Sequence, residues 1–317
     1  MTRLTVIIPA YNREKHIGRT LESVLAQTYA HFDLILVDNA STDTTPALLQ
    51  AFAERCASHP SMRVTLLSES RHGACAARNA GLRFAATDWV IFFDSDDAMH
   101  PELIERYAQA IDTHGDSLDI IHVPSRVVDA VTGSTTVRKA VTAHYLACQL
   151  HHSFLSTQCY AVRRSLIEAV GAWDEKLMGW NDWELGTRLL LASERVMSLA
   201  TEPLVTITSH PTSITGTRVS DKPDTWLAAI EKVRADIDRS GRPDRNRLLS
   251  IVEYRRLVVA GLCTKEGARV GKEIYEATLR HLPRRLRPLF ALLYRYIAIG
   301  GKGGSHILNA ALRLLRL

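Results

Sequence analysis

Three aspartates crowd into four positions at Asp94, Asp96 and Asp97, directly after the apolar run 90–93. Carboxylates this close repel one another unless a cation lies among them. Mg²⁺ or Mn²⁺ would relieve the repulsion, because each is a hard cation that takes one or two protein carboxylates while substrate phosphates complete its shell. One of the three can instead cap the helix expected from Pro101, but a cap uses only one carboxylate. The run predicts a Mn²⁺ or Mg²⁺ site and leaves Asp97 open between that site and the cap.

Further polar residues follow two other apolar runs. The first run ends in Pro9, Ala10 and Tyr11, and Asp38 follows the run 34–37. In nucleotide-binding α/β sheets a carboxylate at the end of a strand reaches a ribose hydroxyl. These residues are therefore candidates for binding a nucleotide.

A third candidate segment, residues 73–81, reads GACAARNAG. Its small residues would let backbone amides at a helix N-terminus beginning near Gly73 approach an anion closely. The same pattern is also typical of a helix packed tightly on a sheet. Arg78 and Asn79 favour the binding interpretation, because a guanidinium suits a diphosphate and an amide suits a base edge.

Three of the chain's five tryptophans, Trp173, Trp180 and Trp183, fall within eleven residues beside four carboxylates. Aromatic faces for stacking and carboxylates for hydroxyls are typical of a sugar site, and one carboxylate could act as a general base. Tryptophans buried in a core explain the cluster equally well. His210 is either a loop residue or a further metal ligand, depending on whether the fold returns it to the aspartates.

The elements that must position these residues alternate over the first 123 positions. Apolar runs predict strands, and the segments between them predict helices; the strands are expected at 4–8, 34–37, 63–67, 89–93 and 119–123, and the helices at 16–27, 46–57, 74–86 and 101–111. This alternation is typical of an α/β fold with a mostly parallel sheet flanked by helices, in which ligands bind at the carboxyl ends of the strands. Three polar strand ends should therefore meet at one crevice.

After Val123 the alternation stops. Residues 127–137 predict a hairpin, 157–162 a strand and 164–169 a helix, all of which should complete the sheet. From about Asp221 the pattern is largely helical.

The net charge of +5 comes from the C-terminal end of the chain. Residues 280–317 hold eight Lys and Arg and no Asp or Glu, and subtracting these eight charges leaves −3 for residues 1–279. Arginines that alternate with apolar residues at helical spacing are typical of a helix on an anionic membrane surface, and equally of a helix packed on its own domain. Nothing in this charge distribution favours a nucleic-acid partner.

Cysteines and short motifs exclude several classes of protein. The five cysteines are scattered and form no C-x-x-C pair, which argues against a disulfide framework and a zinc site and favours a reducing cytoplasm. No run approaches the ~18 apolar residues that a membrane span requires. P-loop, dinucleotide-binding and H-E-x-x-H motifs are absent.

Six motifs in order resemble those of family 2 glycosyltransferases, which have the glycosyltransferase A fold. They are VIIPAYN, VDNASTD, GACAARNAGL, FFDSDDAMHPELI, GAWDEKL with NDWEL, and HPTSIT, and they span roughly residues 2–215. The resemblance implies an inverting, metal-dependent hexosyl- or N-acetylhexosaminyl-transferase. It would move a sugar from a nucleotide-diphosphate sugar, by preference a UDP-sugar, to a hydroxyl of a glycan or lipid-linked acceptor in cell-surface polysaccharide synthesis.

The resemblance also implies roles for individual residues. Asp94 and Asp96 match the D-x-D element, whose second member binds the metal on the diphosphate, and His210 and Ser213 match a late element that in some members reaches the metal or the diphosphate. Asp182 matches the general base. The donor-binding positions are Pro9, Ala10, Tyr11, Asp38, Gly73, Arg78, Asn79, Asp94 and Ser95.

The sequence departs from the family pattern at Asn181, where members usually carry Glu before the base. The base is retained, so the departure concerns the acceptor, for which Trp180, Asn181 and Trp183 are the candidate contacts. We expect a catalytic domain at 1–220, with a nucleotide-sugar half at about 1–123 and an acceptor half at about 124–220. A helical, basic region at 221–317 follows. The expected location is cytoplasmic, with peripheral attachment to the inner face of a membrane through 280–317.

Two other classes stay open from the sequence alone. A non-catalytic relative of the same fold would bind a nucleotide-sugar or a membrane surface without turnover. A phosphatase of the haloacid dehalogenase type also carries Asp-x-Asp after a strand, but its pair follows the first strand and precedes Thr or Val. Here the pair follows the fourth strand and runs into Asp97 and Ala98, which disfavours the phosphatase.

Overall fold

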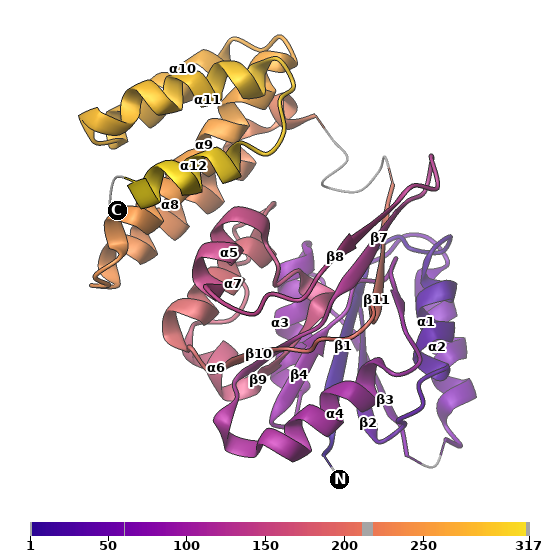
Figure 1. The fold of residues 1–317 in the computed structure, drawn as a ribbon. Helices are drawn as coiled ribbons and strands as arrows, with labels where there is room; N and C mark the ends of the chain where they lie inside the picture. The colour runs from indigo at the N-terminus through magenta and orange to yellow at the C-terminus, as the bar shows by residue number, and fades with distance from the viewer. Residues whose placement is uncertain (1, 60, 211–217, 315–317) are drawn as a thin grey trace. The chain divides into compact units, whose positions relative to one another are not determined.

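A computed structural model describes residues 2–59, 61–210 and 218–314, which form two compact units (Figure 1). Unit 1 consists of Met1–Tyr145, Phe154–Lys176 and Ala192–His210. Unit 2 consists of Leu146–Ser153, Leu177–Leu191 and Pro211–Leu317.

Unit 1 is built on a seven-stranded sheet of order β10-β6-β9-β4-β1-β2-β3. Its strands are β1 (Leu4–Ala10), β2 (Phe32–Asp38), β3 (Arg63–Ser68), β4 (Trp89–Phe92), β6 (Ile120–His122), β9 (Tyr160–Arg163) and β10 (Val196–Ser198). β1 pairs in parallel with β2 and β4, whereas β9 lies antiparallel between β4 and β6. The mostly parallel α/β sheet expected from the alternating pattern is confirmed.

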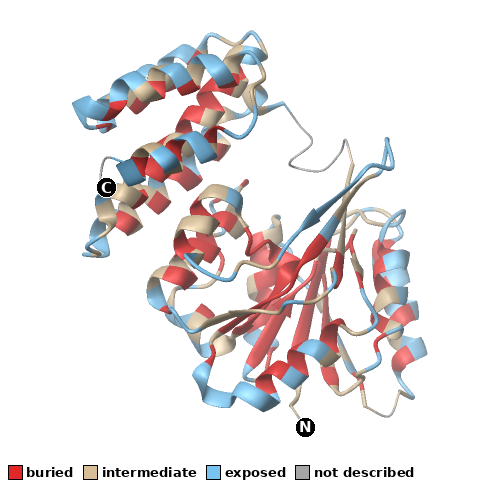
Figure 2. Ribbon diagram, viewed as in Figure 1, coloured by how far each residue is buried: buried red, intermediate tan, exposed pale blue. Residues whose placement is uncertain are grey.

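Helices flank this sheet, and the sheet itself forms the core. The helices of unit 1 are α1 (Ile17–Leu25), α2 (Thr45–Cys56), α3 (Ala74–Phe84), α4 (Leu103–His114) and α6 (Arg164–Ala169). Figure 2 shows the central strands as buried, and every residue of β1 is buried. α3 lies so close to β1 that a Cβ on Gly81 would fall 2.4 Å from Cγ2 of Ile7. Gly81 therefore serves tight helix-to-sheet packing, whereas a Cβ on Gly73 would meet nothing within 4 Å.

A second, four-stranded sheet has the order β5-β11-β7-β8. Its strands are β5 (Ala98–Met99), β7 (Ser125–Asp129), β8 (Thr135–Arg138) and β11 (Val205–Ser209). The predicted hairpin is confirmed as β7 and β8, in which Val127 lies opposite Thr136. The expectation that it completes the main sheet is wrong, because it pairs with β11 in this second sheet. The strand expected at 157–162 begins only at Tyr160, because Thr157–Cys159 form a 3₁₀ turn. β11 pairs with β5, directly after the aspartate run, and so returns His210 to it.

Unit 2 is helical. It contains nearly all of α5 (Tyr145–His152) and α7 (Asn181–Ala192), together with α8 (Pro223–Arg239), α9 (Arg245–Lys265), α10 (Val270–His281), α11 (Arg287–Ala298) and α12 (Gly304–Leu314). α9 packs against α8, α10, α11 and α12. The helical pattern expected after Asp221 is confirmed.

The basic segment 280–317 has both a packed face and an exposed one. Phe290 and Leu293 of α11 are buried, whereas Leu292 and Ile299 are 64% and 84% exposed. Within the described ranges, no helix combines the length and hydrophobicity that crossing a membrane requires.

Candidate active site

The carboxyl ends of β1, β2 and β4 lie side by side in unit 1. Ala10 pairs with Asp38, and the N–H of Asn39 donates to the Ala10 carbonyl at 2.8 Å. On the other side of β1, the N–H of Phe93 donates to the Ile7 carbonyl at 2.9 Å. The structure therefore brings together the three polar strand ends that the sequence singled out.

An arginine lies beside the first aspartate of the run. Nη2 of Arg78 donates to Oδ1 of Asp94 at 2.6 Å, and the Arg78 side chain is only 6% exposed. Its guanidinium also lies 4.4 Å from the centroid of the Trp173 ring. One of the three crowded carboxylates is thus neutralised by the protein itself.

The second aspartate faces basic residues from two segments. Oδ2 of Asp96 lies 3.1 Å from Nε2 of His210 and 3.7 Å from Nη2 of Arg13. The ring of His16 stacks on that of His210 with centroids 5.1 Å apart, and Arg19 donates to the Asp96 carbonyl at 2.5 Å. Burial and the His210 charge lower the pKa of His16. The expected approach of His210 to the aspartates is found here, while Ser213 lies outside the described residues.

Arg13, His16 and Arg19 were missed from the sequence. Their signal was available, since these three and Lys15 give four basic side chains within nine residues of the end of β1. The loop between β1 and α1 is a usual place for anion-binding groups in such sheets.

The third aspartate has a structural role. Asp97 is 2% exposed, and its carboxyl accepts hydrogen bonds from the Thr208 N–H at 2.8 Å and from the Gln158 amide. Burial, with the charges of Asp94 and Asp96 adding to it, raises the pKa of the Asp97 carboxyl well above its ordinary value. Asp97 therefore ties the aspartate run to β11 rather than capping the next helix.

Asn79 is engaged inside the protein. Its Nδ2 donates to the Trp173 carbonyl at 2.9 Å, and its Oδ1 accepts the Trp173 N–H at 3.1 Å. This reciprocal pair holds the loop before unit 2 against α3. The amide expected at a base edge is used in this conformation to position Trp173, on whose ring Arg78 rests.

A buried asparagine that the sequence reasoning passed over organises the loops next to Asp38. Asn39 is 3% exposed and donates to the carbonyls of Glu69 and Arg71 at 2.9 and 2.8 Å. Its Oδ1 accepts the N–H of Gly73 at 2.9 Å, and Gly73 has φ +126°, which glycine adopts readily. The position of Asn39 directly after Asp38 was the available signal.

The remaining donor-side candidates differ in access. Tyr11 is 45% exposed and meets the His72 ring edge-on at 5.6 Å. Asp38 is partly exposed, whereas Pro9, Ala10 and Ser95 are buried. Tyr11 and Asp38 therefore offer the accessible side chains at this edge.

Asp182 lies in unit 2, in the first turn of α7. Its Oδ1 accepts the N–H of Trp183 at 2.8 Å, and the positive end of the helix dipole favours a carboxylate there. The Trp183 side chain is fully buried, and its Nε1 donates to the Leu150 carbonyl at 3.2 Å. Trp183 is thus a core residue in this structure, while Trp180 and Asn181 are partly exposed.

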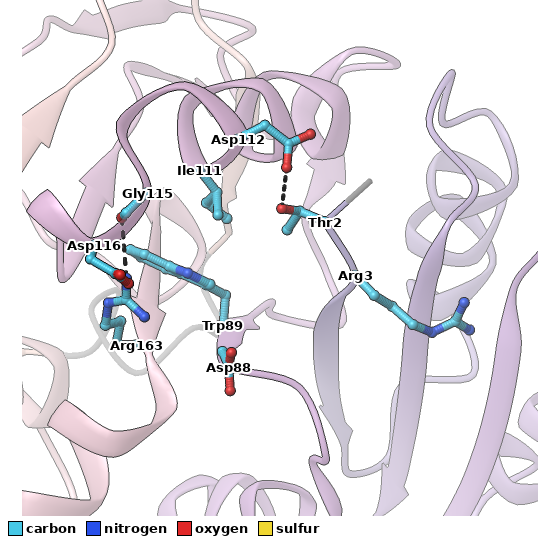
Figure 3. A pocket seen from close by; sticks show the side chains of 9 residues that line it. All are labelled: Thr2, Arg3, Asp88, Trp89, Ile111, Asp112, Gly115, Asp116 and Arg163. Carbon is cyan, nitrogen blue, oxygen red and sulfur yellow. Dashed lines mark hydrogen bonds and ion pairs between the residues drawn. The ribbon is translucent and has the colours of Figure 1, made fainter.

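A cavity of about 360 Å³ lies elsewhere in unit 1, at the amino ends of β1 and β4 (Figure 3). Its charged residues pair with their neighbours: Arg163 with Asp116 at 3.1 Å, and Asp112 with Thr2. No candidate site residue lines it. The candidate residues lie instead at the opposite edge of the sheet, at the carboxyl ends of its strands.

Comparison with known proteins identifies the family of this chain. The family model described as glycosyl transferase family 2 matches residues 5–171. A Haemophilus influenzae protein named an uncharacterized glycosyltransferase is 26% identical over 65% of this chain and 68% of its own length. The succinoglycan biosynthesis protein ExoO of Rhizobium meliloti is 34% identical, but over 39% of this chain and 35% of its own length.

Solved structures resemble the whole chain in fold. The crystal structure of residues 1–349 of S. aureus TarS in complex with UDP-GlcNAc has a TM-score of 0.73 at 21% identity, over 99% of this chain and 92% of that one. The mannosyltransferase PcManGT of Pyrobaculum calidifontis, solved with GDP-Man and Mn²⁺, has a TM-score of 0.58 at 20% identity, over 98% and 86%. At these identities the likeness shows the fold, which is the glycosyltransferase A fold. Since the family model covers more than half of the chain, this protein belongs to glycosyl transferase family 2.

Proposed function

We propose that this protein transfers a sugar from a nucleotide-diphosphate sugar to a hydroxyl of a glycan or lipid-linked acceptor, with inversion at the anomeric carbon. The observation that carries the proposal is the meeting of Asp38, Asp94 and Asp96 at the adjoining ends of β2, β1 and β4, beside basic side chains. Such an edge can bind a ribose, a diphosphate and a cation together.

On the donor side, the accessible groups divide by chemistry. The Tyr11 ring would stack on the base, and the Asp38 carboxylate would accept hydrogen bonds from the ribose hydroxyls. Arg13 would lie against the diphosphate, because a cationic donor forms short, strong hydrogen bonds to phosphate oxygens, and the His16 ring would lie beside it. Arg78 would contribute to donor binding indirectly, by neutralising the Asp94 carboxylate.

The residues around Asp96 fit a divalent cation in part. Within the described ranges, no group of three or more His, Cys, Asp or Glu side chains is arranged to hold a metal ion. Asp96 and His210 do supply a carboxylate oxygen and an imidazole nitrogen 3.1 Å apart, and both suit Mn²⁺. These two residues would hold Mn²⁺ or Mg²⁺, with Asp94 nearby, and the donor's phosphates would complete its shell. When bound, the cation would supply charge that stabilises the departing diphosphate.

On the acceptor side, Asp182 would remove the proton of the acceptor hydroxyl as that oxygen attacks the anomeric carbon. The new C–O bond forms as the bond to the diphosphate breaks, so one displacement inverts the centre and needs no covalent enzyme intermediate. Trp180 and Asn181 would contact the acceptor, and Trp183 would position α7 from the core. In this proposal the catalytic residues lie within 1–220, and 221–317 is a supporting helical region.

The choice of donor and pathway is proposed from the relatives. TarS binds UDP-GlcNAc, which supports a UDP-sugar. ExoO is named for succinoglycan synthesis and an Erwinia amylovora relative, 26% identical, for amylovoran synthesis. We therefore propose a role in cell-surface polysaccharide synthesis, in the cytoplasm.

The test is release of nucleoside diphosphate from a panel of nucleotide-sugars, with Mn²⁺ and candidate acceptors. We expect turnover with one donor class. Asp96→Ala should remove the metal-dependent part of donor binding, whereas Asp182→Asn should bind donor normally and stop transfer. Binding without turnover by the wild-type protein would favour the non-catalytic alternative, and normal turnover by Asp182→Asn would refute the assignment of the base.

We also propose that the exposed face of α11 contacts an anionic membrane surface. Leu292 and Ile299 are exposed and lie close in sequence to Arg287 and Arg295, as in helices that lie in a membrane interface. The buried face of the same helix packs within unit 2. Both interpretations of the basic segment can therefore hold at once, one for each face.

A further inference from the structure

The first turn of α7, which carries Asp182, is held by helices that are remote from it in sequence. Nε2 of Gln149 in α5 donates to the carbonyls of Asp182 and Trp183 at 3.4 and 3.2 Å. Just before the turn, a Cβ on Gly179 would fall 2.7 Å from Cζ3 of Trp226 in α8. The backbone around Asp182 is thus pinned from two sides.

A third contact comes from Arg255 of α9. Its guanidinium carbon lies 4.3 Å from the centroid of Trp180 and 4.8 Å from that of Trp183. Its two terminal nitrogens donate to the His151 carbonyl and to Oγ of Ser153, each at 3.1 Å. A planar guanidinium with two aromatic contacts and two hydrogen bonds has little freedom to move.

Trp180 itself is held in a strained conformation. Its φ is +50°, a region that side-chain-bearing residues rarely adopt and that costs about 1–3 kcal/mol. The ring packs against Trp226 at 5.1 Å and Trp183 at 5.8 Å, in addition to Arg255. We call Trp180, Trp183, Trp226 and Arg255 the tryptophan cage. Its packing offsets the strain and sets the direction in which the chain enters α7.

The cage also carries charge close to Asp182. Burial lowers the pKa of Arg255 to about 10, and the Asp182 carboxylate opposes that shift. Since the attraction between two charges is mutual, the guanidinium stabilises the ionised form of Asp182. Burial lowers the pKa of His151 to about 4 and also lowers that of His152, so both are largely uncharged at pH 7.

Further charged or titratable groups lie around the cage. Lys232 and Glu184 pair with each other at 3.0 Å, Arg247 lowers the pKa of His151, and burial raises that of the Tyr254 hydroxyl. Lys232 is paired with Glu184, and the two histidines are largely uncharged at pH 7. Arg255 is therefore the cation to remove in order to test the charge on Asp182.

We propose that Arg255 is a positioning residue for the transfer step: from the C-terminal helices it holds the tryptophan cage and supplies the positive charge in whose field Asp182 lies. This inference rests on the proposed function in taking Asp182 as the base. It gives the helical region 221–317 a part in the chemistry of the catalytic domain. A cavity of about 230 Å³, lined in part by Trp180, Arg255 and Tyr254, lies beside the cage and leaves room for a ligand group there.

The test follows the Asp182 carboxyl directly, by carbon-13 NMR titration of aspartate-labelled full-length protein, with Asp182→Asn to assign the signal. In Arg255→Met we expect the titration midpoint to rise by about one pH unit, which corresponds to about 1.4 kcal/mol. The matched control is Arg256→Met. Arg256 is the next residue of α9, but it pairs with Glu253 and Glu231 at 3.0 and 2.5 Å.

Arg255→Lys separates charge from geometry. Lysine keeps the positive charge, so the midpoint should return to within about 0.3 units of wild type, while the planar contacts with both indoles are lost. With UDP-GlcNAc or whichever donor the panel identifies, both Arg255 variants should lower kcat, by on the order of 10²-fold in Arg255→Met, and leave the donor KM unchanged. Arg256→Met should keep kcat within about threefold.

The outcomes distinguish this inference from the proposed function. An unchanged midpoint in Arg255→Met, or an equal rise in Arg256→Met, overturns the role of Arg255 whether or not the protein turns over. Wild-type protein without turnover on any donor overturns the proposed function instead, and the titration still decides whether Arg255 acts on Asp182. A fall in donor affinity that matches the fall in kcat would also overturn the inference, because it would indicate general damage to the fold.

Discussion

Arg78→Met tests whether the cation that relieves the aspartate run is an arginine of the protein. The variant keeps the length and apolar stem of the side chain and removes the guanidinium that lies 2.6 Å from Asp94 and 4.4 Å from the Trp173 ring. Breaking a buried ion pair costs about 3–5 kcal/mol. Asp94 is 29% exposed, so water screens it in part and about 2 kcal/mol is expected from the pair. The lost contact with Trp173 adds about 1 kcal/mol.

The expected total of about 3 kcal/mol corresponds to a fall in Tm of ~6–12 °C for a unit of this size. Urea unfolding of the metal-free protein measures it, so that no bound cation can compensate. Arg83→Met is the matched control. It lies on the same helix, is 57% exposed and reaches Glu69 only at 3.5 Å, so its effect should stay within about 0.5 kcal/mol.

A double-mutant cycle with Asp94→Asn isolates the pair. We expect a coupling energy of about 2 kcal/mol, because the second substitution removes the carboxylate that the first leaves uncompensated. UDP binding should follow the same logic: Arg78→Met weakens it, and adding Asp94→Asn recovers roughly tenfold, since the bare carboxylate no longer repels the diphosphate. A coupling energy below about 0.5 kcal/mol would show that Arg78 does not neutralise Asp94.

Three further predictions concern the core, α3 and α11. Burial lowers the pKa of His122 to about 3, so as the pH falls the unfolded chain binds a proton before the folded protein does. The free energy of unfolding should therefore fall by about 2 kcal/mol from pH 7.5 to pH 5. Urea titrations at both pH values should show that His122→Asn removes this pH-dependent fall. Gly81→Val should lower Tm by at least ~5 °C, because even a Cβ there would fall 2.4 Å from a methyl of Ile7; an unchanged Tm contradicts the packing of α3. The pair Leu292→Asp and Ile299→Asp should keep Tm and abolish flotation with phosphatidylglycerol vesicles, and undiminished flotation rules out that face of α11.

The meeting of the polar strand ends was largely predictable because its signals are local. An apolar run followed at once by Asp or Asn marks a buried strand and its carboxyl end, and parallel strands bring those ends to one edge. Asp38 and Asp94 could therefore be assigned to a common crevice. The return of His210 was only an option from the sequence, because it depends on the pairing of β11 with β5, between residues more than 100 positions apart.

The partners of these side chains could not be predicted, because one residue type serves several contacts equally well. A side-chain amide can bind a nucleotide base or a backbone peptide group equally well. Asn79 binds the backbone of Trp173, 94 positions away, only because the loop that carries Trp173 lies on α3. The three tryptophans show the same limit: spacing put Trp183 beside the acceptor, but the orientation of α7 turns its ring into the core. Arg255 carried no motif, and its relation to Asp182 arises only because the fold brings its guanidinium over the rings of Trp180 and Trp183. Local patterns thus locate candidate ligand-binding residues, whereas the residues that hold them in place are set by long-range packing. Further positioning residues should therefore be sought in the C-terminal helices.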